Sequence, residues 1–393
     1  MNEGSRRAKP LPYGRQTIEA DDIAAVTRVL QSDWLTCGPS VTEFESNFAS
    51  FVESKHAVAV NSGTAALHCA MHAIGITAGD EVIVPAISFA ATANCVVYQG
   101  GHPVFSDVDP RSLLIDPIDI ERLITPKTRA IIAVDYAGQP CDYDALRSIC
   151  DEHQLWLVAD ACHSVGASYH GRPCGSLADL TAFSFHPVKS MTTGEGGMTT
   201  TDNPEFSQKM RQFRNHGIVQ DFRQRESNGQ WEYDIREIGF NYRISDFQCA
   251  LGTTQLQKLP GWLDRRRQIA ERYTSQFAEC RHIQPLEVQA HVEHAYHLYV
   301  VRLGSGQSHA LRANVFQRLR SIGINVNVHY RPIYLHSFYR ERFGYKAGLC
   351  PNAESVYGQI LSLPVFPGMT NEDVDFVVEE LLAATANASS VAA

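Results

Sequence analysis

The feature that most constrains the fold is an alternation of short apolar segments with longer segments of helical character. Apolar residues recur at helical spacing over 18–30, and residues 65–74 contain few helix breakers. Alternating strands and helices predict an α/β fold with a mostly parallel central sheet flanked by helices. The apolar segments, each typical of a buried strand, are 56–60, 81–84, 103–105, 130–135 and 155–158.

The pattern changes after residue 244, where a long amphipathic stretch reaches Phe277. Pro260 and Gly261 interrupt it, and we expect the helix to kink or break there because proline lacks a backbone donor. We therefore predict a large domain over residues 1–255, its N-terminal segment free to pack on the second domain, and a smaller C-terminal α/β domain over 256–393. Within the smaller domain we expect strands at 296–302 and 325–329, and a closing helix over 370–383 with Thr370 as N-cap.

Composition limits the possible partners. The 393 residues are 44% hydrophobic and 20% charged, which is enough to bury a large core. A formal net charge of -9 argues against a nucleic-acid partner, and no apolar run is long enough to span a bilayer. The ten cysteines are scattered without a C-x-x-C pair, which is typical of reduced thiols in a cytoplasmic protein rather than of a zinc site or a disulfide framework.

One lysine lies between two apolar stretches, where an exposed loop lysine is not expected. Lys189 follows the run AFSFHPV, and upstream of it an apolar strand ends in Asp160. A lysine amine can bind the aldehyde of pyridoxal 5'-phosphate covalently, while a carboxylate can keep the pyridine nitrogen protonated. A buried carboxylate is costly without a cationic partner, and a pyridinium would be that partner. The pair predicts pyridoxal phosphate as the cofactor.

Neighbouring residues fit the same cofactor, although each also has a simpler structural interpretation. Gly63 and Thr64 lie where a strand meets a helix, and free N–H groups at a helix start suit a phosphate; alone, the motif is better interpreted as an N-cap turn. Ser184 could reach the phosphate or close a strand end. His163 could contact the phenolic oxygen or be structural, and Phe89 could stack on the pyridine ring or belong to the core.

Together these motifs resemble those of the DegT/DnrJ/EryC1/StrS family of sugar aminotransferases, which have aspartate aminotransferase fold type I. Within the family, the sequences DYAG at 135–138 and VHYRPIY at 328–334 are similar to those of the pseudaminic acid branch. The resemblance extends from about Tyr13 to about Leu382 and rests on NSGT at 61–64, the block 85–94, DACH at 160–163, SFHPVK at 184–189, EGG at 195–197, RNHG at 214–217, GFNYR at 239–243 and LPVFP at 363–367.

The resemblance implies roles for individual residues. Lys189 and Asp160 would be catalytic, and Asn241 would reach the cofactor phosphate of the neighbouring subunit in a homodimer with shared active sites. Arg331 would hold a diphosphate. The cofactor-binding residues would be Gly63, Thr64, Phe89, Asp160, His163, Ser184, Lys189 and Asn241, and the substrate-binding residues Tyr13, Asp33, Trp34, Leu35, Thr36, Gly63, Ser184, Asn241, His329, Tyr330, Arg331 and Pro332.

The implied activity is that of a pyridoxal phosphate-dependent aminotransferase. It would move the amino group of L-glutamate to the C4 ketone of a UDP-linked 4-keto-6-deoxy-N-acetylhexosamine. The alternatives are an aminotransferase for a different keto sugar, a dehydratase of the same fold and a non-catalytic regulatory protein that binds the cofactor. Lys189 disfavours the dehydratase, whose relatives carry histidine there, and an NAD enzyme would need a glycine fingerprint that is missing. The glycine run at 194–197 predicts a hairpin turn instead.

Overall fold

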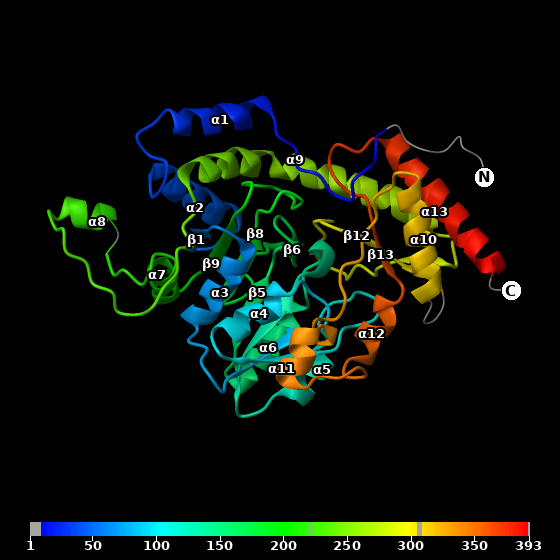
Figure 1. Ribbon diagram of the computed structural model, residues 1–393, viewed down its shortest axis with the longest axis horizontal. Helices are drawn as coiled ribbons and strands as arrows, with labels where there is room; N and C mark the ends of the chain where they lie inside the picture. The colour runs from blue at the N-terminus through cyan, green and yellow to red at the C-terminus, as the bar shows by residue number, and fades with distance from the viewer. Residues whose placement is uncertain (1–8, 221, 305–308, 392–393) are drawn as a thin grey trace.

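A mixed sheet of seven strands forms the centre of the protein in the computed structural model, which describes residues 9–220, 222–304 and 309–391 (Figure 1). The strand order is β1-β9-β8-β5-β4-β2-β3. Only β9 runs antiparallel to its neighbours, so the predicted α/β fold with a mostly parallel sheet is confirmed. The strands are β1 (His56–Val60), β2 (Glu81–Pro85), β3 (His102–Ser106), β4 (Thr128–Val134), β5 (Trp156–Asp160), β8 (Leu180–Ser184) and β9 (Gly197–Thr201).

Helices enclose this sheet, which explains why its strands are apolar on both faces. In β4 every residue except Arg129 is buried, as expected for a strand covered from both sides. Each of the five strands expected from the sequence overlaps an observed one. The surrounding helices are α2 (Pro39–Phe51), α3 (Gly63–Ala73), α4 (Ala91–Tyr98), α5 (Pro117–Leu123), α6 (Tyr143–His153) and α7 (Pro204–Phe213), and a small sheet of β6 (Ser168–Tyr169), β7 (Arg172–Pro173) and β11 (Val292–Glu293) adjoins them.

The long helix α9 (Asp246–Phe277) is continuous through Pro260, so the expected break there is wrong. Pro260 itself is exposed, while Leu256, Leu259 and Leu263 are buried on the other side of the helix. Packing of this apolar face therefore outweighs the local cost of proline. Helix α1 (Ala20–Leu30) lies along α9 at the top of Figure 1.

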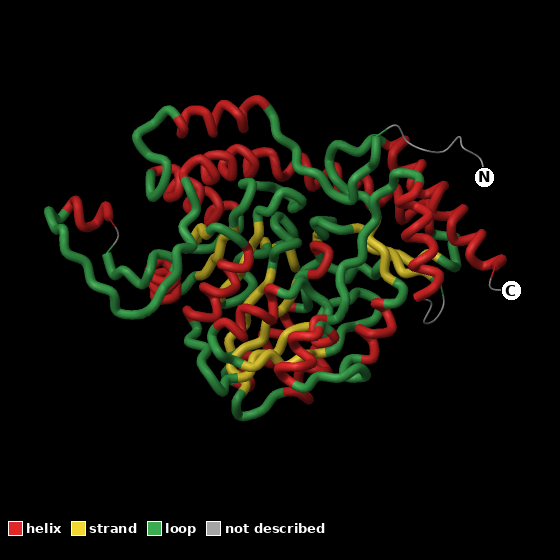
Figure 2. The backbone as a smooth tube through the Cα atoms, in the orientation of Figure 1, coloured by secondary structure: helices red, strands yellow, loops and turns green. Residues whose placement is uncertain are grey.

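A second, smaller core lies at the C-terminal half of α9. Its antiparallel sheet has the order β10-β12-β13, and its strands form a separate group in Figure 2. Leu11 belongs to this core, and its N–H donates to the carbonyl of Gly323 at 2.8 Å. The elements are β10 (Ile283–Pro285), β12 (Tyr299–Leu303), β13 (Ile360–Leu363), α10 (His309–Ser321) and α13 (Asn371–Val391), whereas η3 (Ile333–Leu335), α11 (Ser337–Phe343) and α12 (Pro351–Tyr357) return to the first core. A division of the chain at residue 255 stays a prediction.

Two expectations for this region had different outcomes. The Thr370 hydroxyl accepts the N–H of Asp373 at 3.1 Å, which confirms Thr370 as the cap of the closing helix. The strand expected at 325–329 is wrong, because only an isolated bridge joins Asn327 to Ser362. The Asn327 side chain accepts the N–H of Val328 at 2.8 Å, and this local bond replaces a sheet ladder.

An arm, residues 218–220 and 222–240, extends from the body beyond α7 and carries the short helix α8 (Phe222–Ser227) (Figure 1). The outgoing and returning segments of the arm meet in an isolated bridge between Ile218 and Ile235. Across the described ranges, no helix combines the length and apolar character needed to cross a membrane.

Candidate active site

The sheet brings Asp160 and Lys189 to the same edge. Asp160 is the last residue of β5 and pairs in register with Ala182 of the neighbouring strand β8. The chain then turns back into the antiparallel strand β9, as the glycine run predicted, and Lys189 lies in this connection. The Lys189 N–H donates to the carbonyl of His186 at 2.9 Å, so a tight turn presents the lysine. Carboxyl ends of parallel strands are the usual place for a ligand in such a sheet.

A cavity of about 790 Å³ opens at this edge. Its size is ordinary for a site that holds a cofactor together with a small substrate. Most of the predicted cofactor residues lie on its wall, and so do several predicted substrate residues. These are Tyr13, Gly63, Thr64, Phe89, Asp160, His163, Ser184, Lys189, His329 and Tyr330.

Asp160 is 5% exposed and is held by neutral donors. The Thr92 hydroxyl donates to Oδ2 at 2.7 Å and contacts the Ser88 hydroxyl at 2.7 Å, while the N–H of Cys162 donates to Oδ1 at 3.3 Å. In the part of the chain that the structure describes, no lysine, arginine or histidine forms an ion pair with Asp160. A buried carboxylate with neutral partners alone suits a cationic ligand such as a pyridinium.

Lys189 lies in a partly desolvated position on the cavity wall. Burial lowers the pKa of its ammonium group below the usual value, and the nearby Cys162 and Asp160 oppose this shift. A lysine with a lowered pKa has more of its amine in the neutral form, which is the form that attacks an aldehyde or accepts a proton.

Histidines form the wall beside Lys189. His163 Nε2 lies 3.3 Å from the Tyr330 hydroxyl, whereas its Nδ1 is buried and has no hydrogen-bond partner among the described residues. The ring of His297 lies 4.5 Å from that of His163, centroid to centroid. Burial, with Lys189 and His329 adding to it, holds the pKa of His163 well below its usual value, so this imidazole is neutral. The unpaired Nδ1 is therefore available to a cofactor oxygen.

His329 is held from both sides. Its Nδ1 lies 2.9 Å from the Ser362 hydroxyl and its Nε2 lies 3.2 Å from the Asn327 amide nitrogen. Because that amide nitrogen can only donate, Nε2 accepts and Nδ1 carries the hydrogen. Burial, followed by Lys189, lowers the pKa of His329 to about 4. The ring thus has a fixed position and a fixed neutral form.

The start of α3 forms an anion cradle. The Ser62 hydroxyl accepts the N–H of Ala65 at 3.1 Å, whereas no hydrogen bond to the N–H of Gly63 or of Thr64 occurs within the described ranges. A Cβ atom on Gly63 would lie 2.7 Å from the Cβ of Ser184, so glycine alone permits this close approach. Two free amides next to a serine hydroxyl suit a phosphate.

Other predicted residues do not line this cavity. Arg331 is exposed, and its Nη2 donates to the carbonyl of Leu335 at 2.8 Å, while Pro332 is buried. Asn241 lies at the base of the arm, where its carbonyl accepts from Asn61 Nδ2 at 3.3 Å. Residues 33–36 are also away from the wall, although Thr36 lines a different cavity. Their roles stay predictions, and that of Asn241 depends on a second subunit.

Sequence reasoning missed several residues on the wall and one behind it, Thr92, which holds Asp160. Thr92 lies inside the block 85–94, but nothing in the sequence distinguishes it from its alanine, serine and threonine neighbours. His297 had an available signal, since it is a histidine in an apolar segment that predicts a strand. The remaining polar residues on the wall that were given no role are Asn61, Ser62, Ser88, Cys162, His186, Glu195, Gln248 and Asn327.

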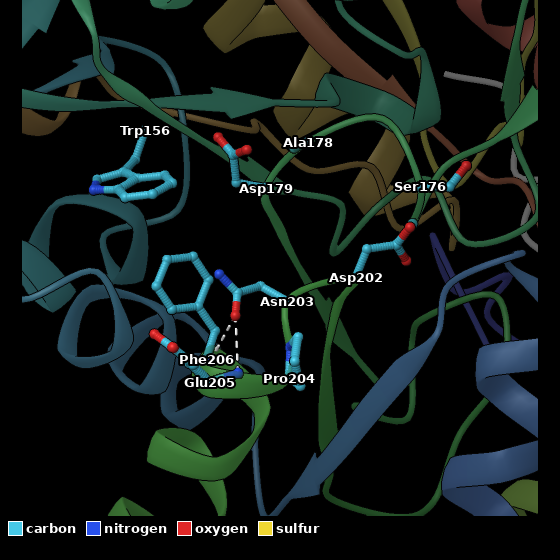
Figure 3. A pocket seen from close by; sticks show the side chains of 10 residues that line it. Trp156, Ser176, Ala178, Asp179, Asp202, Asn203, Pro204, Glu205 and Phe206 are labelled. Carbon is cyan, nitrogen blue, oxygen red and sulfur yellow. Dashed lines mark hydrogen bonds between the residues drawn. The ribbon is translucent and has the colours of Figure 1, made fainter.

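A second hollow, of about 530 Å³, lies at the opposite edge of the sheet, where Trp156 begins β5 (Figure 3). Its polar groups already have structural partners. Asn203 Oδ1 accepts the N–H groups of Glu205 and Phe206 at the start of α7, and Asp179 Oδ2 accepts the N–H of Leu157 at 2.8 Å. The groups suited to cofactor chemistry therefore lie in the cavity that contains Lys189.

The sequence and the structure are both similar to those of known proteins. A model of the DegT/DnrJ/EryC1/StrS aminotransferase family matches residues 16–382. The chain is 42% identical to the spore coat polysaccharide biosynthesis protein SpsC of Bacillus subtilis, over 94% of this chain and 95% of that protein. The putative sugar aminotransferase Spr1654 from Streptococcus pneumoniae, in its PMP form, is 33% identical with a TM-score of 0.91, covering 96% of this chain and 99% of that one. Helicobacter pylori PseC, an aminotransferase involved in the biosynthesis of pseudoaminic acid, is 31% identical with a TM-score of 0.91, covering 96% and 100%.

Proposed function

Because this chain belongs to the DegT/DnrJ/EryC1/StrS aminotransferase family, whose structural relatives are pyridoxal phosphate-dependent sugar aminotransferases, we propose a specific sugar substrate for it. The substrate is a UDP-linked 4-keto-6-deoxy-N-acetylhexosamine, and the amino donor is L-glutamate. The product is UDP-4-amino-4,6-dideoxy-N-acetyl-β-L-altrosamine, for pseudaminic acid biosynthesis. The observation that carries this choice is the likeness to PseC, together with the sequences at 135–138 and 328–334.

The cavity fits pyridoxal phosphate at each of its polar ends. Asp160, bonded only to neutral donors, would hold the ring nitrogen, and the unpaired Nδ1 of His163 would meet the phenolic oxygen. The free amides of Gly63 and Thr64, with the Ser184 hydroxyl, would hold the phosphate. When bound, the cofactor supplies an electron-withdrawing ring that stabilises negative charge on the carbon bearing the transferred nitrogen.

Lys189 has two tasks in this mechanism. Its nitrogen would hold the cofactor aldehyde covalently until an amino donor replaces it. The freed Lys189 amine would then act as the general base and acid that moves the proton of the donor's α-carbon, and it would serve the sugar ketone in the same way. Thr92 fixes the Asp160 carboxylate, which would keep the ring nitrogen protonated. The neutral histidines exclude water without adding a competing positive charge.

We propose that the active form is a homodimer with shared sites. The arm exposes large apolar residues, with Trp231 83% and Ile238 85% exposed, and Tyr233, Ile235 and Phe240 beside them. Such a patch is typical of a protein interface. Burying it against a second copy would bring Asn241, at the arm's base, to the partner's cofactor phosphate. All ten cysteines are free, which supports the proposal of a reducing, cytoplasmic location.

A related aminotransferase activity on a different keto sugar is the second candidate. The 42% identity to SpsC, a protein of spore coat polysaccharide biosynthesis, favours it. Both candidates share the cofactor chemistry and differ only in the sugar pocket. A non-catalytic protein that binds the cofactor is the third candidate, and turnover with glutamate separates it from the other two.

The first experiment is visible absorption spectroscopy of the protein loaded with pyridoxal phosphate, before and after L-glutamate. The wild type should show the band of a lysine-bound cofactor, and glutamate should bleach it. Lys189→Ala should lack the band, whereas Lys55→Ala, an exposed lysine paired with Asp202, should keep it. Incubation with a panel of UDP-linked and TDP-linked keto sugars then identifies the amino acceptor. If Lys189→Ala bound and bleached like the wild type, the assignment of Lys189 would be wrong.

A further inference from the structure

A third cavity, of about 680 Å³, lies between α2, α7 and the base of the arm. None of the residues on its wall belongs to the wall of the Lys189 cavity. Among the described residues, four arginines line it, against a single carboxylate, that of Glu45. The arginines are Arg211, Arg214, Arg225 and Arg243.

The Glu45 carboxylate already forms ion pairs with two of the arginines. Glu45 Oε2 accepts Arg211 Nη1 at 2.6 Å, and Oε1 accepts Arg214 Nη1 at 2.6 Å. Glu45 is buried, and the two guanidinium groups hold its pKa below the usual value against the effect of burial. This triad leaves one positive charge uncompensated and fixes the two arginines on the cavity wall.

Arg225 and Arg243 have no carboxylate partner within the described ranges. Arg243 Nη1 donates to Asn215 Oδ1 at 2.8 Å. Arg225 Nη1 donates to the carbonyl of Gln220 at 2.6 Å, and its guanidinium lies 5.1 Å from the centroid of the Tyr233 ring. These bonds orient both side chains and, among the residues that the structure describes, use only part of each donor fork, so further N–H groups remain for an anion.

We propose that this arginine cavity binds a phosphorylated anion, namely the diphosphate of a nucleotide. A diphosphate carries at least two negative charges, and guanidinium groups bind phosphate oxygens in a bidentate manner. The cavity volume lies in the range of small-molecule sites, and Val41, Ile218 and Ile244 add an apolar part to the wall. The proposal that this cavity binds an anion rests on the four arginines and does not depend on the proposed function.

The choice of UDP as the ligand rests on the proposed function. Lys189 is the only lysine or arginine among the described residues that line the active-site cavity, so a sugar nucleotide needs cations from elsewhere for its diphosphate. Thr36, from the stretch predicted to face substrate, lines the arginine cavity. Arg243 follows by two residues Asn241, which is predicted to reach the partner's cofactor phosphate, so a diphosphate held by Arg243 would lie close to that shared site.

Cys37 provides a local reporter, because this exposed free thiol lines the same cavity. Holoenzyme saturated with pyridoxal phosphate is treated with a thiol-alkylating reagent in the presence and absence of UDP, and each cysteine is followed by mass spectrometry. UDP should slow alkylation of Cys37 at least fivefold and leave Cys280, a half-buried thiol that follows α9, unchanged. Inorganic diphosphate should protect as well, and sodium chloride at the same ionic strength should not.

Arginine variants test whether the protection of Cys37 by UDP depends on these side chains. Arg243→Gln and Arg225→Gln should each raise the UDP concentration for half protection about tenfold or more, which is the effect of losing one charged hydrogen-bond partner. Arg236→Gln, on the arm but outside the cavity and 76% exposed, should behave as wild type. Sedimentation velocity on each variant shows whether its assembly state has changed, and protection is compared between variants of equal size.

Two results would overturn the proposal. Either UDP leaves Cys37 alkylation unchanged, or it protects Cys37 equally in wild type and in both arginine variants. The first result would mean that the cavity does not bind UDP. Bleaching of the cofactor band by glutamate does not involve the arginine cavity, so this failure would be distinct from failure of the proposed aminotransferase activity.

Discussion

At the scale of single residues, the Thr92 hydroxyl determines how Asp160 presents its carboxylate. It donates to Oδ2 at 2.7 Å from a fully buried position. Thr92→Val keeps the shape and removes the donor. A hydrogen bond to a charged group contributes about 1.5–3 kcal/mol, so we expect pyridoxal phosphate to bind about 10- to 100-fold more weakly. Spectroscopic titration of the cofactor measures this, Thr92→Ser should bind as tightly as wild type, and equal affinity of the valine variant would contradict the role of Thr92.

The limits of sequence reasoning at this scale follow from how the site is built. Lys189 and Asp160 could be predicted because a charged residue next to an apolar strand is unusual and its chemistry is specific. Thr92 could not, because its importance comes from lying beside β5, and the sequence does not state which strands are neighbours. Arg331 was expected at a diphosphate, but its guanidinium bonds a local carbonyl in the described chain.

At the scale of elements, α9 continues through Pro260 because its apolar face is packed. Pro260→Ala should raise the free energy of unfolding by about 1–2 kcal/mol, since the helix gains a backbone hydrogen bond and part of that gain is offset by a more flexible unfolded chain. Gly261→Ala, where a Cβ atom meets nothing within 4 Å, should add about 1 kcal/mol by helix propensity alone. Urea denaturation measures both changes. A less stable Pro260→Ala would mean that proline is required in α9.

Gly217 controls the base of the arm. Its φ is +73°, and a Cβ atom there would lie 1.9 Å from the carbonyl oxygen of Glu237 on the returning segment. Gly217→Ala should therefore displace the arm and weaken the proposed dimer at least tenfold, as measured by sedimentation equilibrium. Gly229, with φ +64° and nothing within 4 Å, supplies the control, because alanine there adds similar backbone strain without a collision. If Gly217→Ala formed a dimer as tight as that of the wild type, the position of the arm would not matter for dimerisation.

The presence of the central strands was easier to predict from the sequence than the places where a strand-like pattern does not form a strand. Strands β1 to β5 could be read from apolar runs because burial on both faces leaves few polar residues in them. The segment 325–329 was predicted to be a strand because Val326 and Val328 alternate with Asn325 and Asn327, as in a half-buried strand. In the structure the Asn327 side chain accepts the backbone N–H of Val328, which a strand would use in its ladder.

At the scale of the whole molecule, buried neutral histidines make stability depend on pH. Burial lowers the pKa of His294 to about 3 and, as the largest cause, those of His68 and His329 to about 4. The unfolded chain takes up these protons near pH 6.5 and the folded chain does not, so stability is lost as the pH falls from about 6.5 to about 4. Each histidine contributes a slope of up to about 1.4 kcal/mol per pH unit.

One buried carboxylate acts in the opposite direction. Burial raises the pKa of Asp135 to about 6, so the folded chain holds that proton more tightly and gains stability as the pH falls below 6. The loss from the histidines should prevail, giving a lower melting temperature at pH 5 than at pH 7. His329→Gln isolates one contribution, because its melting temperature should fall less over the same interval. An equal fall in both proteins would contradict a neutral His329.

The N-terminal segment has a consequence for biosynthesis. The carbonyl of Tyr13 accepts the N–H of Val365 at 3.1 Å, and Leu11 is inserted in the second core, so a cavity residue from the beginning of the chain is fixed by one synthesised more than three hundred residues later. The large sheet, whose last strand ends at Thr201, can form while translation continues. The cavity wall cannot be completed until residue 365 has left the ribosome, and stable capture of the cofactor therefore marks a chain whose synthesis has passed that point.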